Sequence, residues 1–140
     1  MPTWLIYALA SAFFAAITSI LAKIGIAGVD SNLATAIRTV VILFFAWILV
    51  AYQGHLKDVV TLNRTNLIFL ILSGIATGLS WLFYFKALQM GTVNKVVPID
   101  KLSLVLAIII AAVFLKEKVS AFGWVGVALI SLGTLLTTFK

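Results

Sequence analysis

The sequence of 140 residues is 64% hydrophobic and 10% charged, with a mean hydropathy of +1.23. Soluble domains average about 45–50% apolar residues, and a small soluble fold leaves much of its surface in water, so this composition excludes an ordinary soluble protein. The net charge is +6, but the ten Lys and Arg residues are scattered over helix ends and loops, which does not indicate nucleic acid binding. The absence of cysteine excludes disulfides, thiolate metal sites and cysteine nucleophiles.

Five segments are long enough and apolar enough to cross a membrane. A helix rises about 1.5 Å per residue and the hydrocarbon core is about 30 Å thick, so one crossing needs roughly 20 mainly apolar residues. The sequence therefore predicts an all-α membrane protein, with five transmembrane helices in a compact bundle and a single domain over residues 1–140. The expected helices cover residues 4–26, 33–52, 67–88, 95–115 and 119–139.

The first crossing, Trp4–Ala22, is an uncharged run of 19 residues that is rich in small side chains. Ser11 and Thr18 lie on one helical face, where such residues let helices approach closely or line a polar path. A cleaved secretory signal is the competing interpretation, but the segment has no basic leader and is too long for the apolar core of a signal. We expect it to remain as a helix.

The second crossing carries a charge, Arg38. Trimmed at Arg38, this crossing leaves 14 residues, which span only about 21 Å, so the guanidinium must lie below the membrane surface. The third crossing, Leu67–Phe85, is uncharged and places Trp81 near its end, at about the level of Arg38. Trp81 can form an aromatic wall for a site or belong to an interfacial belt.

The fourth crossing contains Pro98, Asp100 and Lys101, and again leaves only 14 uncharged residues. Pro98 cannot donate to the carbonyl of Asn94 and so can free an oxygen close to Asp100. Because Asp100 and Lys101 point about 100° apart on a helix, we expect Asp100 to take its partner from elsewhere. Arg38 enters from the same side at a matching depth. The alternative is that these charges are plain interfacial anchors, with Pro98 in a first turn and Asp100 protonated and silent.

The fifth crossing, Val119–Phe139, is uncharged over 21 residues. It places Gly123, Gly126 and Gly133 among apolar side chains. Glycines in such a setting suit close packing against another helix, and we expect this helix to form a dimer contact rather than to bind substrate.

An odd number of crossings puts the two ends of the chain on opposite sides of the membrane, and side A is defined here as the side of Met1. The basic residues near the two surfaces balance, with Lys57, Arg64, Lys116 and Lys118 on side A and Lys23, Lys86, Lys95 and Lys140 on side B. Orientation normally follows the excess of Lys and Arg on the cytoplasmic side. With no excess, either both orientations are made or the depth of individual charges fixes one.

Several stretches together resemble a known family. The stretch PIDKLSLVLAIIIAAVFLKEK followed by GWVGVALISLGTLL is similar to the end of an EamA domain of the drug/metabolite transporter superfamily. That domain has a proline-containing fourth helix, an acidic residue in the short loop, here Glu117, and a glycine-rich fifth helix. The stretches AIRTVVILF in the second crossing and SWLFYFKALQMG at the end of the third also fit, so the resemblance covers the whole chain.

The resemblance implies a secondary transporter for small metabolites or drugs, often an exporter. Most members have ten helices made of two such halves, and in a direct fusion the second half is inverted relative to the first. This sequence corresponds to one half, so an antiparallel homodimer working by alternating access is the leading hypothesis. We expect a multi-pass protein of a prokaryotic inner membrane whose partners are the lipid bilayer, a small-molecule substrate and a second, inverted copy.

The charges narrow the expected substrate class. The four-helix small multidrug members of the superfamily bind cations through a glutamate in their first helix, and this chain has no acid from Met1 to Val29. A neutral, zwitterionic or anionic metabolite, such as an amino acid, is therefore favoured over a cationic drug. The pathway is predicted to contain Asp100, Arg38, Lys101, Pro98, Trp81, Ser11 and Thr18.

Three alternative functions stay open. One is an exporter of cationic drugs, and another is a non-transporting membrane subunit or heterodimer partner that packs through the fifth helix. An enzyme is the most distant reading, because the sequence has no phosphate loop, no nucleophile with its base and no metal-ligand spacing, and so predicts no cofactor.

A single cysteine added beside Lys140 tests the orientation, since the chain has no native cysteine. We expect an impermeant thiol reagent to label about half of the molecules from outside intact cells, because the basic residues are balanced between the two sides. Labelling of all or none would rule out a symmetric inverted dimer.

Overall fold

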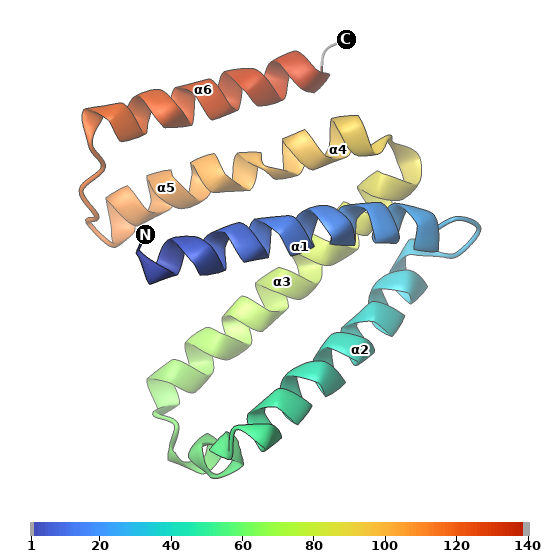
Figure 1. Ribbon diagram of the computed structural model, residues 1–140, viewed down its shortest axis with the longest axis vertical. Coiled ribbons are helices and arrows are strands. Elements are labelled where there is room, and N and C mark those ends of the chain that lie inside the picture. Colours follow the sequence, from blue (N-terminus) through green and yellow to red (C-terminus); the bar gives the residue numbers. More distant parts are fainter. Residues whose placement is uncertain (1, 139–140) are drawn as a thin grey trace. The chain divides into compact units, whose positions relative to one another are not determined.

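A computed structural model describes residues 2–138 and contains, within that range, helices and turns but no strand (Figure 1). Five helical segments of this part of the chain are long and apolar enough to cross a membrane. They are α1 (Thr3–Gly25), α2 (Ser31–Tyr52), α3 (Arg64–Met90), the consecutive pair α4 (Val93–Asp100) and α5 (Leu102–Phe114), and α6 (Ala121–Thr138). The prediction of an all-α protein with five membrane-crossing segments is confirmed. The expected helix end at Phe139 and the Lys140 position lie outside the described residues.

One compact unit covers residues 24–89 and consists of α2, most of α3 and the short 3-10 helix η1 (His55–Thr61) between them. Gly28 and Gly54 have φ angles of 73° and 80°, a left-handed conformation that costs glycine least, and they form the turns before α2 and η1. The Asp30 carboxylate accepts hydrogen bonds from the backbone N–H groups of Asn32 and Leu33 and so caps the start of α2. The buried side chains of this unit gather where α2 begins and α3 ends: Ile26, Ser31, Thr35, Tyr84, Phe85 and Leu88.

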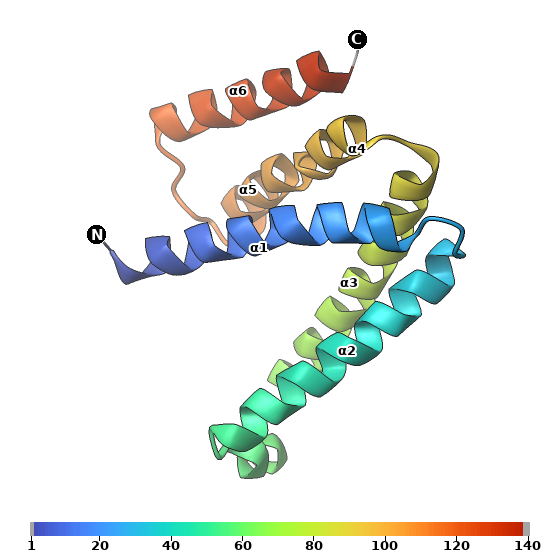
Figure 2. The same ribbon diagram turned by 45° about the vertical axis from the view of Figure 1, so that its right-hand side comes forward.

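The other compact unit covers the chain up to Lys23 and from Met90 on, and contains most of α1 with α4, α5 and α6. Helix α6 runs back along both α4 and α5, as both views show (Figure 2). The Ser120 hydroxyl accepts a hydrogen bond from the Gly123 N–H and caps α6. A Cβ at Gly123 would lie 2.8 Å from Val119 Cγ1, so a larger residue there would force the Val119 side chain to shift.

Most of the large apolar side chains point outward. Phe83 of α3 is 74% exposed and Phe122 of α6 is 90% exposed, and long apolar stretches of every crossing share this property. Soluble proteins rarely expose such continuous apolar surface, whereas lipid or a neighbouring helix covers it without cost. The exposed apolar surface therefore indicates a lipid environment, as the composition does.

Replacing Asp30 with alanine removes the acceptor for two backbone N–H groups at the start of α2. We expect the free energy of unfolding in lipid micelles to fall by about 1 kcal/mol, as for other lost N-caps, whereas Asp30→Asn keeps an acceptor and retains nearly all of it. Denaturant titration monitored by circular dichroism measures both variants. An unchanged free energy of unfolding in Asp30→Ala would show that the cap does not stabilise the helix.

Candidate functional site

Arg38 lies on the face of a tryptophan ring. Its Cζ atom is 3.4 Å from the centroid of the Trp81 ring, so the guanidinium of α2 stacks directly on α3. A guanidinium is planar and more weakly hydrated than an ammonium, which suits it to an aromatic face away from bulk water. The sequence placed Arg38 and Trp81 at one level, and in the structure they are in contact.

Two further rings complete the surroundings of Arg38. The Phe85 ring centroid is 5.7 Å from Arg38 Cζ, and Tyr84 packs edge-on against Trp81 with centroids 5.5 Å apart. Positions 81, 84 and 85 share one face of α3 because residues three and four apart are neighbours on a helix. Tyr84 and Phe85 are buried. We call Trp81, Tyr84 and Phe85 the aromatic cage.

A groove of about 390 Å³ runs between α2 and α3 in the same unit. Its polar lining residues, Asn32, Thr35 and Thr39, come from α2, and Gly78 and Leu82 line it from α3. Arg38 and Trp81 lie close to these residues in sequence but do not line the groove. The hydroxyls of Thr35 and Thr39 donate to the carbonyls one turn back, at Ser31 and Thr35, so the groove wall carries no unpaired buried donor there.

Asp100 pairs with its neighbour, which corrects the expectation from the sequence. The Lys101 ammonium lies 3.3 Å from the Asp100 carboxylate, although adjacent residues on a continuous helix point about 100° apart. The Lys101 side chain is long enough to bend back to the Asp100 carboxylate, at the point where α4 ends and α5 begins. Arg38 and Asp100 belong to different units, and their pairing stays a prediction.

The interruption at Lys101 is a local tightening of the helix. The Lys101 N–H is shared between the carbonyls of Val97 and Pro98, and the Leu104 N–H reaches only three residues back, to the Lys101 carbonyl. Pro98 lies inside α4, where its ring removes one ladder hydrogen bond just before this point. Such 3-10 stretches inside a helix often mark hinges, and here one falls on the charged pair of a membrane crossing.

The sequence as a whole matches a known family model over residues 2–139. The chain belongs to the EamA-like transporter family. A protein of Sinorhizobium sp. described as "Uncharacterized transporter in cobO 3'region" is 46% identical over 134 residues, which cover 96% of this chain and 95% of the relative. No solved structure matches the chain significantly. The family resemblance seen in the sequence is confirmed, and it points to a multi-pass membrane transporter rather than an enzyme.

The other predicted positions of this EamA-like transporter lie in different surroundings. Ser11 is exposed and Thr18 is half-buried on α1. A Cβ at Gly126 or Gly133 would meet no atom within 4 Å, so these two glycines of α6 face open space in the structure. Gly123 instead lies beside α5.

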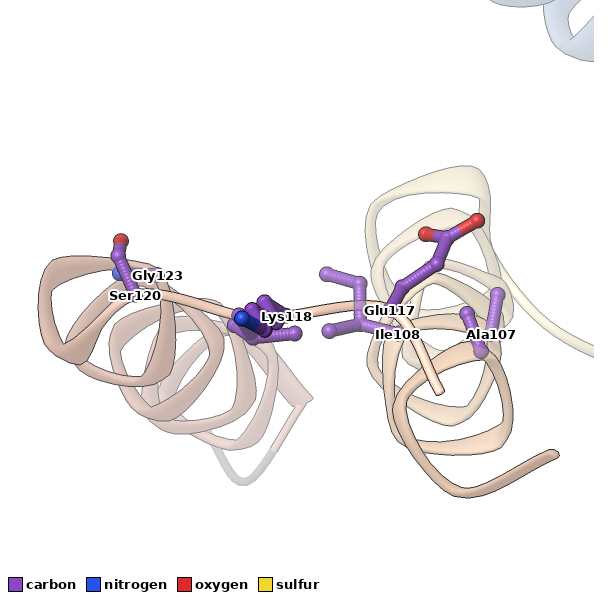
Figure 3. A pocket seen from close by; sticks show the side chains of 8 residues that line it. Ala107, Ile108, Glu117, Lys118, Ser120 and Gly123 are labelled. Carbon is purple, nitrogen blue, oxygen red and sulfur yellow. The ribbon is translucent and has the colours of Figure 1, made fainter. Parts of the chain in front are cut away.

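Gly123 lines a groove of about 480 Å³ between α5 and α6. Figure 3 shows Ala107 and Ile108 projecting from α5, Ser120 and Gly123 at the start of α6, and Lys118 from the loop between them. The α5 lining of this groove begins at Ala107, six residues and about 9 Å along the helix from Lys101, and neither Asp100 nor Lys101 lines it. It is therefore separate from the charged site.

Two polar contacts were missed by the sequence analysis. The Lys23 ammonium donates to the Gly91 carbonyl at 2.7 Å, in the turn before α4, and the Gln89 side chain donates to the Val29 carbonyl at 2.9 Å. Both acceptors are backbone oxygens in turns, which a search for complementary side chains does not find. They could have been sought from the rule that carbonyl groups at the end of a helix have no donor within the helix and take one from elsewhere.

Proposed function

We propose that this EamA-like protein is a secondary transporter that exports a small neutral, zwitterionic or anionic metabolite, with an amino acid as the leading example. The observation that carries the proposal is the interruption of the fourth crossing at Asp100 and Lys101. Membrane carriers build binding sites where a broken helix brings charges and free backbone groups to the interior. Arg38, held on Trp81, supplies a second cationic group in another crossing.

The charges favour a substrate that carries a carboxylate. Arg38 presents its guanidinium face to Trp81, and in the described part of residues 24–89 no carboxylate lies within ion-pair distance of it. A guanidinium stacked in this way keeps its N–H edge available, and that edge matches a carboxylate in a bidentate pair. Asp100 beside Lys101 offers a complementary contact for an ammonium group. Export of cationic drugs fits less well, because two of the three charged groups proposed for the pathway, Arg38 and Lys101, are positive.

Two oppositely oriented copies would form the working unit in the inner membrane of a prokaryote. The balance of basic residues permits both orientations, and the bacterial relative matches over nearly its whole length, so it is also about one five-helix unit long. Ten-helix carriers alternate between two inverted halves around a central site. Paired inverted copies would place one set of charged groups towards each face, as alternating access requires.

A second candidate function is a non-transporting membrane subunit that packs against a different protein through α6. The observation in its favour is the open space at Gly126 and Gly133, where a close helix would fit. Recovery of an obligate complex with another membrane protein, together with no flux from the purified chain, would support this function instead.

Flux in proteoliposomes tests the transporter proposal. A panel of labelled amino acids and organic acids is loaded, and efflux is measured for the parent chain and for Asp100→Asn and Arg38→Ala. We expect at least one compound to leave through the parent chain, and each substitution to lower that flux by about tenfold or more, as when a charged hydrogen-bond partner of a substrate is lost.

Arg64→Ala is the matched control, because Arg64 lies at the exposed start of α3 with no ring against it. It should leave the flux unchanged. Equal flux in the parent, Asp100→Asn and Arg38→Ala proteins would remove both residues from the pathway, and no flux of any compound would favour the subunit function.

A further inference from the structure

The aromatic cage is already occupied by a cation that belongs to the chain. Arg38 Cζ lies 3.4 Å from the Trp81 centroid and 5.7 Å from the Phe85 centroid, and Tyr84 closes the set with its ring 6.3 Å from that of Phe85. Both distances from Arg38 Cζ lie within the range in which the negative face of an aromatic ring attracts a positive charge. The three rings and the arginine all lie in the unit of residues 24–89.

The same cage has the chemistry of a site for an organic cation. Sets of aromatic rings bind quaternary ammonium groups in proteins because these groups are large, weakly hydrated and positive. The cage lies mostly out of water, since Phe85 is only 2% exposed and Tyr84 is 9% exposed. With Arg38 removed, the faces of Trp81 and Phe85 would be left without a charge to attract.

Arg38 competes with free cations for the aromatic cage because it is attached to the same chain. Arg38 is held on α2 beside the rings, so its effective local concentration at the cage is at least about millimolar. A free cation has to compete with that concentration. No acid of this unit counteracts it, because Asp30 caps α2 and Asp58 pairs with His55 in the loop. A cation entering the cage would have to displace Arg38 and would then meet its positive charge nearby.

We propose that Arg38 is an internal occupant of a cation-binding aromatic cage, and that its presence makes the site reject organic cations such as quaternary ammonium compounds. The residue thereby acts as a determinant of charge selectivity in addition to any contact with substrate. The proposal concerns binding alone, so it is separate from the flux measurement and can fail or hold independently of transport.

Binding of choline to the purified full chain in detergent tests the proposal. Ligand-observed NMR titrations compare choline with dimethylbutanol, its uncharged isostere, for the parent protein and Arg38→Ala. We expect Arg38→Ala to bind choline at least about tenfold more tightly than the parent protein does, with no comparable gain for dimethylbutanol. Adding Trp81→Leu to Arg38→Ala should abolish the gain, and Arg64→Ala should show none.

Arg38→Gln provides a second variant that keeps much of the side chain but not its charge, and it should gain choline affinity to a smaller extent. Circular dichroism and gel filtration confirm that each variant is folded. The proposal is overturned if the folded Arg38 variants bind choline no better than the parent protein. It is also overturned if dimethylbutanol gains equally, which indicates a plain apolar cavity, or if the gain survives Trp81→Leu.

Discussion

The hydrocarbon interior of a membrane offers no water, so each charge carried into it needs a partner from the protein. A charged side chain at the centre of a crossing helix costs about 2.5–3.5 kcal/mol on insertion scales. A desolvated cation on an aromatic face recovers about 2 kcal/mol of this, and Arg38 on Trp81 has that geometry. In the fourth crossing, Lys101 and Asp100 neutralise one another at 3.3 Å. The two compact units thus meet the same requirement in different ways.

These partners are compatible with the proposed role of the charges in transport. The Trp81 ring covers one face of the Arg38 guanidinium and leaves its edge for another group, while the Asp100 pair lies at the junction of α4 and α5. A transporter must both bind and release its substrate. Its charged groups therefore need partners within the protein, so that no charge is left without a partner after the substrate has gone. Membership of the EamA-like transporter family fits this arrangement, and the balance of basic residues at the two surfaces fits a paired assembly.

The number of crossings could be predicted because the length of an apolar run and the membrane thickness are both simple quantities. The common level of Arg38 and Trp81 followed from the same counting, since each lies a known number of turns from a helix end. The contact of Lys101 with Asp100 was not predicted, because it depends on how the flexible lysine side chain bends rather than on the spacing of the two residues along the helix. The bond from Lys23 to the Gly91 carbonyl was missed for another reason, since its acceptor is backbone and leaves no trace in residue type.

The central claim is that the charges lie within the membrane and line a water-accessible path. Measuring the depth and the water access of the charged sites tests it most directly. Spin labels on single cysteines at Thr39, next to Arg38, and at Ser103, two residues after Lys101, report depth and contact with a nickel chelate by electron paramagnetic resonance. A label at Leu129 of α6, which is exposed along an apolar face, serves as the lipid-facing reference. We predict that both test positions lie below the headgroups and meet the nickel chelate far more often than Leu129. Labels at headgroup depth, or buried labels no more accessible than the reference, would contradict the account.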